Sequence, residues 1–136
     1  MCLKKSKILL MIGVVMLVFS VTAHAENKKF KFSLNSTSSK ESSLGMAQKS
    51  YDGDTYAYVS PSASESSFQS RNATVKFRVR TEANTHATDV VTVSKPGKYV
   101  MPYLSGRAVG GARYRLYSNV VSASSYPVVL GGLWCP

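Results

Sequence analysis

Residues 73–80 constrain the fold of this chain more than any other stretch. Apolar side chains occupy every second position (Ala73, Val75, Phe77 and Val79), and the positions between them are polar or cationic. Because successive side chains of a β-strand point to opposite faces, this period of two produces one apolar and one cationic face. A helix would mix the two sets around its circumference. The stretch therefore predicts a central strand of an antiparallel sheet, with the core on one side and solvent on the other.

The first 25 residues have the three parts of a secretory signal peptide. A basic start precedes an apolar run over residues 8–21, and Ala23-His24-Ala25 places small residues at the two positions that signal peptidase reads. The apolar run holds 14 residues, whereas a helix that spans a membrane needs about 20. The sequence therefore predicts secretion with cleavage after Ala25, which leaves a single secreted β domain over residues 26–136.

The predicted mature chain is basic and has one cysteine. Three of the 17 basic residues fall in the signal peptide, so 14 remain against 7 acidic residues, a net charge of +7. Cys2 also falls in the signal peptide, so only Cys135 remains. An intrachain disulfide cannot form, and the domain must be stabilised by packing alone. Because an unpaired cysteine in a secreted chain can bridge two copies, Cys135 predicts a possible disulfide-linked dimer.

Other short runs also have strand character. Residues 29–34 alternate, with Phe30, Phe32 and Leu34 predicted to face inward and the lysines between them outward. Pro102 interrupts a further run, which is typical of an edge strand or a bulge. The remaining predicted strands cover residues 55–59, 89–94, 99–104, 113–117 and 126–133.

Serine-rich stretches separate several of these runs. Residues 35–50 and 60–70 have little apolar periodicity and are predicted to be loops. Outside the signal peptide no stretch has a helical stripe. Short strands divided by turn signals predict an all-β fold, an antiparallel β-sandwich or small barrel of about 6–7 short strands.

Residues suited to catalysis or metal binding are scarce. The predicted mature chain has one histidine, His86, in a polar stretch, and a lone histidine there is more often a loop residue than a base or ligand. None of the serines lies in G-x-S-x-G or S-x-x-K, and zinc-ligand spacing is missing. Asp52 and Asp54 flank Gly53 as in a turn rather than a calcium loop. The sequence therefore predicts a protein that is no enzyme and that holds no metal or cofactor.

The cations suggest a binding surface. Seven of them, and one tyrosine, occupy the outward positions of three predicted strands. These eight candidate binding residues are Lys29, Lys31, Lys76, Arg78, Arg80, Arg113, Arg115 and Tyr117. If the three strands share a sheet, the seven cations line one face, which would attract an anionic cell-wall polymer or membrane surface in a salt-dependent way. The alternative is a solvated face that only prevents aggregation. Nucleic acid is disfavoured because no recognition motif is present.

The C-terminal third carries a family resemblance. Ala-Arg-Tyr-Arg-Leu-Tyr over residues 112–117 is followed by a serine-rich turn and by Gly-Gly-Leu-Trp-Cys-Pro over residues 131–136. This pattern resembles the ending of an uncharacterised family of small secreted Firmicutes proteins associated with bacteriocin export and immunity genes. The resemblance implies a Gram-positive source and transfers no catalytic residue.

These observations together predict a secreted, non-enzymatic cell-envelope or bacteriocin-associated interaction protein. The main alternative is a secreted inhibitor or an inert structural protein of the matrix. A third is a hydrolase whose site is assembled from dispersed residues.

Overall fold

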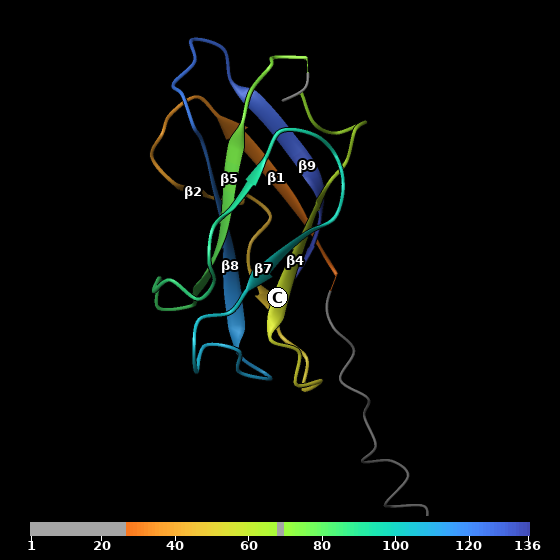
Figure 1. Cartoon of the computed structure of the whole chain (residues 1–136), viewed down its shortest axis with the longest axis vertical. Coiled ribbons are helices and arrows are strands. Elements are labelled where there is room, and N and C mark those ends of the chain that lie inside the picture. The colour runs from red at the N-terminus through yellow and green to blue at the C-terminus, as the bar shows by residue number, and fades with distance from the viewer. Residues whose placement is uncertain (1–26, 68–69) are drawn as a thin grey trace, which may run out of the picture.

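The computed structural model describes residues 27–67 and 70–136 (Figure 1). The predicted signal peptide therefore lies outside the described residues. All regular structure within them is β-strand, and no helix among them could cross a membrane. The strands are β1 (Lys28–Leu34), β2 (Lys40–Glu41), β3 (Ala47–Gln48), β4 (Tyr56–Pro61), β5 (Val75–Thr81), β6 (Val91–Val93), β7 (Tyr99–Pro102), β8 (Arg113–Val120) and β9 (Val128–Cys135).

The strands form two antiparallel sheets that pack face to face. The four-stranded sheet has the order β1-β9-β4-β7, and the five-stranded sheet has the order β2-β8-β5-β6, with β3 also paired to β8. Figure 1 shows β5 and β8 in one layer and β1, β9 and β4 in the other. The predicted all-β fold is confirmed, as a β-sandwich rather than a closed barrel.

The interior of the sandwich follows the alternation of the strands. Val75, Phe77 and Val79 of β5 have no exposed surface, and β5 lies between β8 and β6. The predicted central strand is therefore confirmed. The ring of Phe77 meets those of Phe30 and Phe32 from β1, with centroids 5.6 and 6.0 Å apart in edge-on geometry. This aromatic cluster joins the two sheets, because β1 and β5 belong to different layers.

The prediction of a loop over residues 35–50 is wrong in part. β2 and β3 lie in this stretch and pair with β8, which raises the strand count above the predicted 6–7. Ser42 is buried: its amide donates to Leu116 O at 2.9 Å, and its hydroxyl accepts from Lys31 N at 3.2 Å. The serines here satisfy backbone groups at the edges of both sheets, a role that composition does not distinguish from that of a loop.

The second serine-rich stretch also differs from its prediction. Ser60 and Pro61 belong to β4, and the chain then runs beside β9. The Ser66 hydroxyl donates to Gly131 O at 3.1 Å and accepts from Gly131 N at 3.2 Å. A serine side chain thus takes the place of a neighbouring strand along this part of β9.

The predicted strands over residues 99–104 and 126–133 hold distinct places in the four-stranded sheet. β7, which ends at Pro102, is at the edge, as predicted. β9 is central, between β1 and β4, and it carries the buried Trp134. At Gly132 (φ +156°) an added Cβ would lie 2.1 Å from Ser60 O, so β4 can approach β9 closely only because this residue has no side chain.

Candidate functional site

Two of the three basic strands lie side by side. β5 and β8 pair directly, with Arg78 opposite Tyr117 and Arg80 opposite Arg115. Their outward residues share the outer surface of the five-stranded sheet, which we call the basic face. It consists of Lys76, Arg78, Arg80, Arg113, Arg115 and Tyr117.

Lys29 and Lys31 do not belong to the basic face. They point outward as predicted, but β1 lies in the four-stranded sheet, on the opposite side of the sandwich. The condition for all seven cations to line one face, that the three strands share a sheet, is therefore not met. Alternation determines whether a side chain points toward solvent, but it does not determine which sheet the strand joins.

The arginines of β8 are partly neutralised. Arg115 Nη1 contacts both carboxylate oxygens of Glu41, at 2.9 and 3.1 Å, and Arg113 Nη1 lies 3.7 Å from Glu82 Oε1. Glu41 lies on β2, within the stretch that composition predicts as a loop, so the sequence carried no signal for this pairing. The β5 cations have no ion pair with any residue that the structure describes.

The β5 arginines lie against the sheet. The Arg80 guanidinium sits 4.2 Å from the centroid of the Tyr117 ring, and its Nη1 donates to Asn84 Oδ1 at 3.2 Å. Arg78 Nη1 lies 3.1 Å from both ring nitrogens of His86. The Nε atoms of Arg78 and Arg80 are buried and have no hydrogen-bond acceptor within residues 27–67 and 70–136. Each of these guanidinium groups therefore lies with its Nε against the sheet, and its terminal nitrogens contact His86 or Asn84.

His86 joins the edge of the basic face through a bridge to Arg80. Desolvation, followed by the charges of Arg78 and Arg80, lowers the pKa of His86 below its usual value. The neutral ring can accept the Arg78 hydrogen bond, whereas a protonated ring cannot. The sequence predicts only a loop histidine here, because the Arg–His contact depends on how the segment after β5 turns back.

Asp52 and Asp54 shape a turn, as predicted. Asp52 Oδ1 accepts from Asp54 N at 2.9 Å, and Asp54 Oδ1 accepts from Tyr56 N at 3.1 Å. The Ser50 hydroxyl donates to Asp52 Oδ2 at 2.5 Å and is the main cause of the lowered pKa of Asp52. No group of three or more potential metal ligands comes together in the described part of the chain.

Cys135 is a free, half-buried thiol at the end of β9. Burial is the main reason that its pKa is raised, which disfavours the reactive thiolate. The disulfide-linked dimer stays a prediction.

The chain matches no protein-family model, no curated protein and no solved structure. The resemblance of its C-terminal third to secreted Firmicutes proteins therefore stays a prediction, and the functional argument rests on geometry.

Proposed function

We propose that this protein is an exported, non-enzymatic module that binds an anionic polymer of a Gram-positive cell envelope through the basic face. The observation that carries this proposal is the row of Lys76, Arg78 and Arg80 on β5, which has no carboxylate partner among the described residues. Alternate residues of a strand are about 7 Å apart. The row therefore offers regularly spaced charges to a repeating anionic chain.

The chemistry of the basic face favours many weak contacts. The cations sit on a rigid sheet and can be reached without disturbing the core, so binding requires little reorganisation. Tyr117 holds the Arg80 guanidinium by cation–π contact. Attraction summed over such contacts is strongly reduced by salt, because the screening length falls to roughly 3 Å at 1 M.

Simultaneous replacement of Lys76, Arg78 and Arg80 by serine should release the protein from isolated Gram-positive cell walls. Each cation near an anionic surface contributes about 1 kcal/mol, so the triple variant should bind roughly a hundredfold more weakly at low salt. The variant should still fold, because none of the three side chains is in the core, and only the surface contacts of Arg78 with His86 and of Arg80 with Asn84 and Tyr117 are lost. Cosedimentation with walls, with and without teichoic acid, measures the effect.

The matched control replaces Arg71, Lys95 and Arg107 with serine. Like the test variant, this variant loses two arginines and one lysine. All three residues are exposed and lie outside the strands. It should keep most of the parent's affinity. Equal losses in the two triple variants would show that net charge, not the basic face, drives association.

Neutralising the two carboxylates that pair with arginines of the basic face should strengthen wall binding. Replacement of Glu41 and Glu82 by glutamine frees Arg115 and Arg113 from their carboxylate partners. Wall binding at low salt should tighten about tenfold or more, by the same scale of about 1 kcal/mol per charge. These partly exposed ion pairs contribute at most about 1 kcal/mol each to stability, so the fold should survive.

Glu65→Gln is the control for this gain. Glu65 packs over Gly131 on the four-stranded sheet, away from the basic face. It should tighten binding much less than either Glu41→Gln or Glu82→Gln. A gain from Glu65→Gln as large as theirs would contradict the assignment of the basic face.

A further inference from the structure

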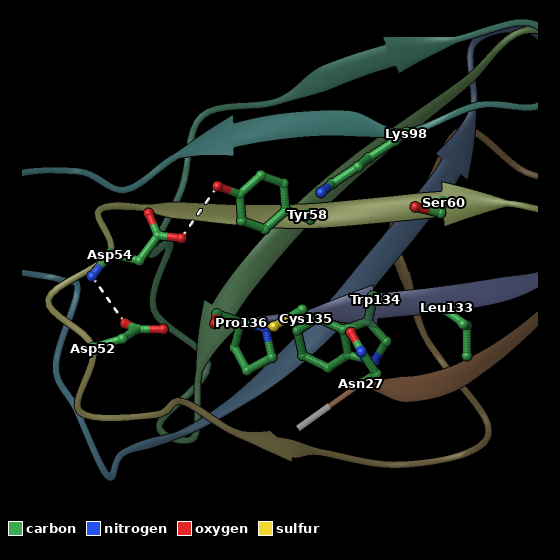
Figure 2. Close-up of a pocket in the computed structure, with 10 residues that line it drawn as sticks. All are labelled: Asn27, Asp52, Asp54, Tyr58, Ser60, Lys98, Leu133, Trp134, Cys135 and Pro136. Atoms are coloured by element: carbon green, nitrogen blue, oxygen red, sulfur yellow. Dashed lines mark hydrogen bonds between the residues drawn. The ribbon is translucent and has the colours of Figure 1, made fainter. Parts of the chain in front are cut away.

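A trough crosses the outer surface of the four-stranded sheet, on the opposite side of the sandwich from the basic face. Its volume is about 320 Å³, near the lower end of the range of roughly 300–1,000 Å³ for small-ligand sites. Pairing of β4 with β9 sets Tyr58 opposite Cys135 and Ser60 opposite Leu133, so these side chains share its floor. Figure 2 shows the trough with the turn of Asp52 and Asp54 at one end.

The acidic end of the trough is held in place before any ligand arrives. The Tyr58 hydroxyl donates to Asp54 Oδ2 at 3.1 Å, and Asp54 N donates to Asp52 Oδ1 at 2.9 Å (Figure 2). Each oxygen that accepts one of these bonds keeps a second lone pair. The carboxylates can therefore accept further hydrogen bonds from a ligand in the trough.

The charges around the trough balance. Lys49 is 2% exposed, and its Nζ lies 3.6 Å from Asp52 Oδ1. The Lys98 amine lies 4.3 Å from the centroid of the Tyr58 ring (Figure 2). Two ammonium groups thus accompany the two carboxylates. Because these four side-chain charges balance, they give neither an anion nor a cation net attraction, in contrast to the side chains of the basic face.

Trp134 lies beneath the floor of the trough. It is 1% exposed and sits opposite the buried Val59 in the pairing of β4 with β9, so its ring faces the core while Leu133 and Cys135 face the trough. The ring is therefore close enough to report a change in the strands that form the floor, without touching the ligand.

We propose that this trough binds an uncharged saccharide unit. Leu133 offers apolar surface to the C–H groups of a sugar ring, while Asp54 can accept from its hydroxyls and Lys98, held over the Tyr58 ring, can donate to them. Sugar hydroxyls both donate and accept, so they pair with this mixture without a net charge. The proposal does not rest on the proposed function, because the trough and the basic face lie on different sheets.

Trp134 makes the test direct, because it is the one tryptophan in the chain. Intrinsic fluorescence would be followed while N-acetylglucosamine, maltose, glucosamine or glucuronate is added to the full mature protein, with reductant present to keep Cys135 as a thiol. A neutral sugar should give a saturable change with a dissociation constant on the order of 1 mM, as expected for a few hydrogen bonds and one apolar contact. Glucosamine and glucuronate should bind more weakly.

Variants locate the site. Lys98→Ser and Leu133→Ser change exposed residues of the trough, so each should fold normally, and together they should weaken the neutral sugar about tenfold or more, equivalent to about 1.4 kcal/mol. Lys29→Ser is the control, because Lys29 lies opposite Leu133 on the same outer surface but does not line the trough. It should leave the affinity unchanged. Amide chemical shifts of Ser60 and Leu133 provide a second readout that does not depend on fluorescence.

Three results would overturn the proposal. These are the absence of a saturable response to either neutral sugar, tighter binding of glucosamine or glucuronate, and equal losses for Lys29→Ser and the trough variants. The serine variant of Lys76, Arg78 and Arg80 should bind the sugar as the parent does. The failure of one site in these tests is thereby distinguishable from the failure of the other.

Discussion

Gly132→Ala is expected to prevent the protein from folding. The alanine Cβ would lie 2.1 Å from Ser60 O and 3.0 Å from Pro61 Cα. Both are backbone atoms of the neighbouring central strand, so no rotamer change can relieve the overlap, and β4 and β9 would have to separate. Decreases of more than about 4–5 kcal/mol in the free energy of unfolding arise from mechanisms of this kind. Such a decrease approaches the whole stability of a small domain. Circular dichroism and urea unfolding measure the result.

Gly106→Ala separates the clash from backbone strain. Gly106 has a positive φ of +73°, and no heavy atom lies within 4 Å of a Cβ built there. Its replacement should cost only the conformational penalty, about 1–2 kcal/mol. Unfolding of Gly132→Ala and Gly106→Ala at the same urea concentration would contradict the close approach of β4 to β9 at Gly132.

Phe77→Ala should destabilise the domain by about 3–5 kcal/mol, the usual cost of emptying a buried phenylalanine site. The side chain has no exposed surface and joins the two sheets through Phe30 and Phe32. Neighbouring strands cannot close the cavity without breaking their own pairing. The free energy of unfolding from urea titration is the measurement, and reduced interior packing should also appear as increased binding of a hydrophobic dye.

The control for Phe77→Ala is its exposed neighbour, Lys76→Ala. The change should alter the free energy of unfolding by less than about 0.5 kcal/mol, as is usual for surface substitutions. Arg78 is a weaker control, because its guanidinium contacts His86 and its Nε is buried. Comparable losses of stability for Lys76→Ala and Phe77→Ala would contradict the division of β5 into a core face and a solvent face.

The two proposed sites differ in the kind of ligand that their electrostatics favour. The basic face carries unpaired charge on a flat sheet and suits a long polyanion, whereas the trough is balanced in charge and suits one small unit. Salt should weaken the first interaction and leave the second nearly unchanged. A polymer that carries both phosphate and sugar groups could engage both surfaces, one on each side of the sandwich.

Local features of the chain were predictable because they follow from strand geometry. The side-chain period of two in residues 73–80 correctly divides Val75, Phe77 and Val79 from their outward neighbours. The turn at Asp52 and Asp54 was equally accessible, since short carboxylate side chains bond the backbone two residues later. Each of these predictions depends only on residues close together in the sequence.

The assignment of strands to sheets was decided by tertiary structure. β1 alternates as β5 does, yet it joins β9 and takes Lys29 and Lys31 to the other side of the sandwich. Strands pair through backbone groups that are the same in every residue, so alternation carries little information about partners. Register and turn geometry over the whole chain select them.

The composition of both sites was decided in the same way. Glu41 neutralises Arg115 although the two are 74 positions apart in the chain, and the trough combines the Asp52–Asp54 turn with residues of β4 and β9 and with Lys98. The sequence by itself determined which side chains of the alternating strands face inward and where the Asp52–Asp54 turn lies, because those depend on local periodicity and on short-range hydrogen bonds. Only the tertiary structure decided which charges are paired and which surfaces form a trough, because those depend on contacts between segments far apart in the chain.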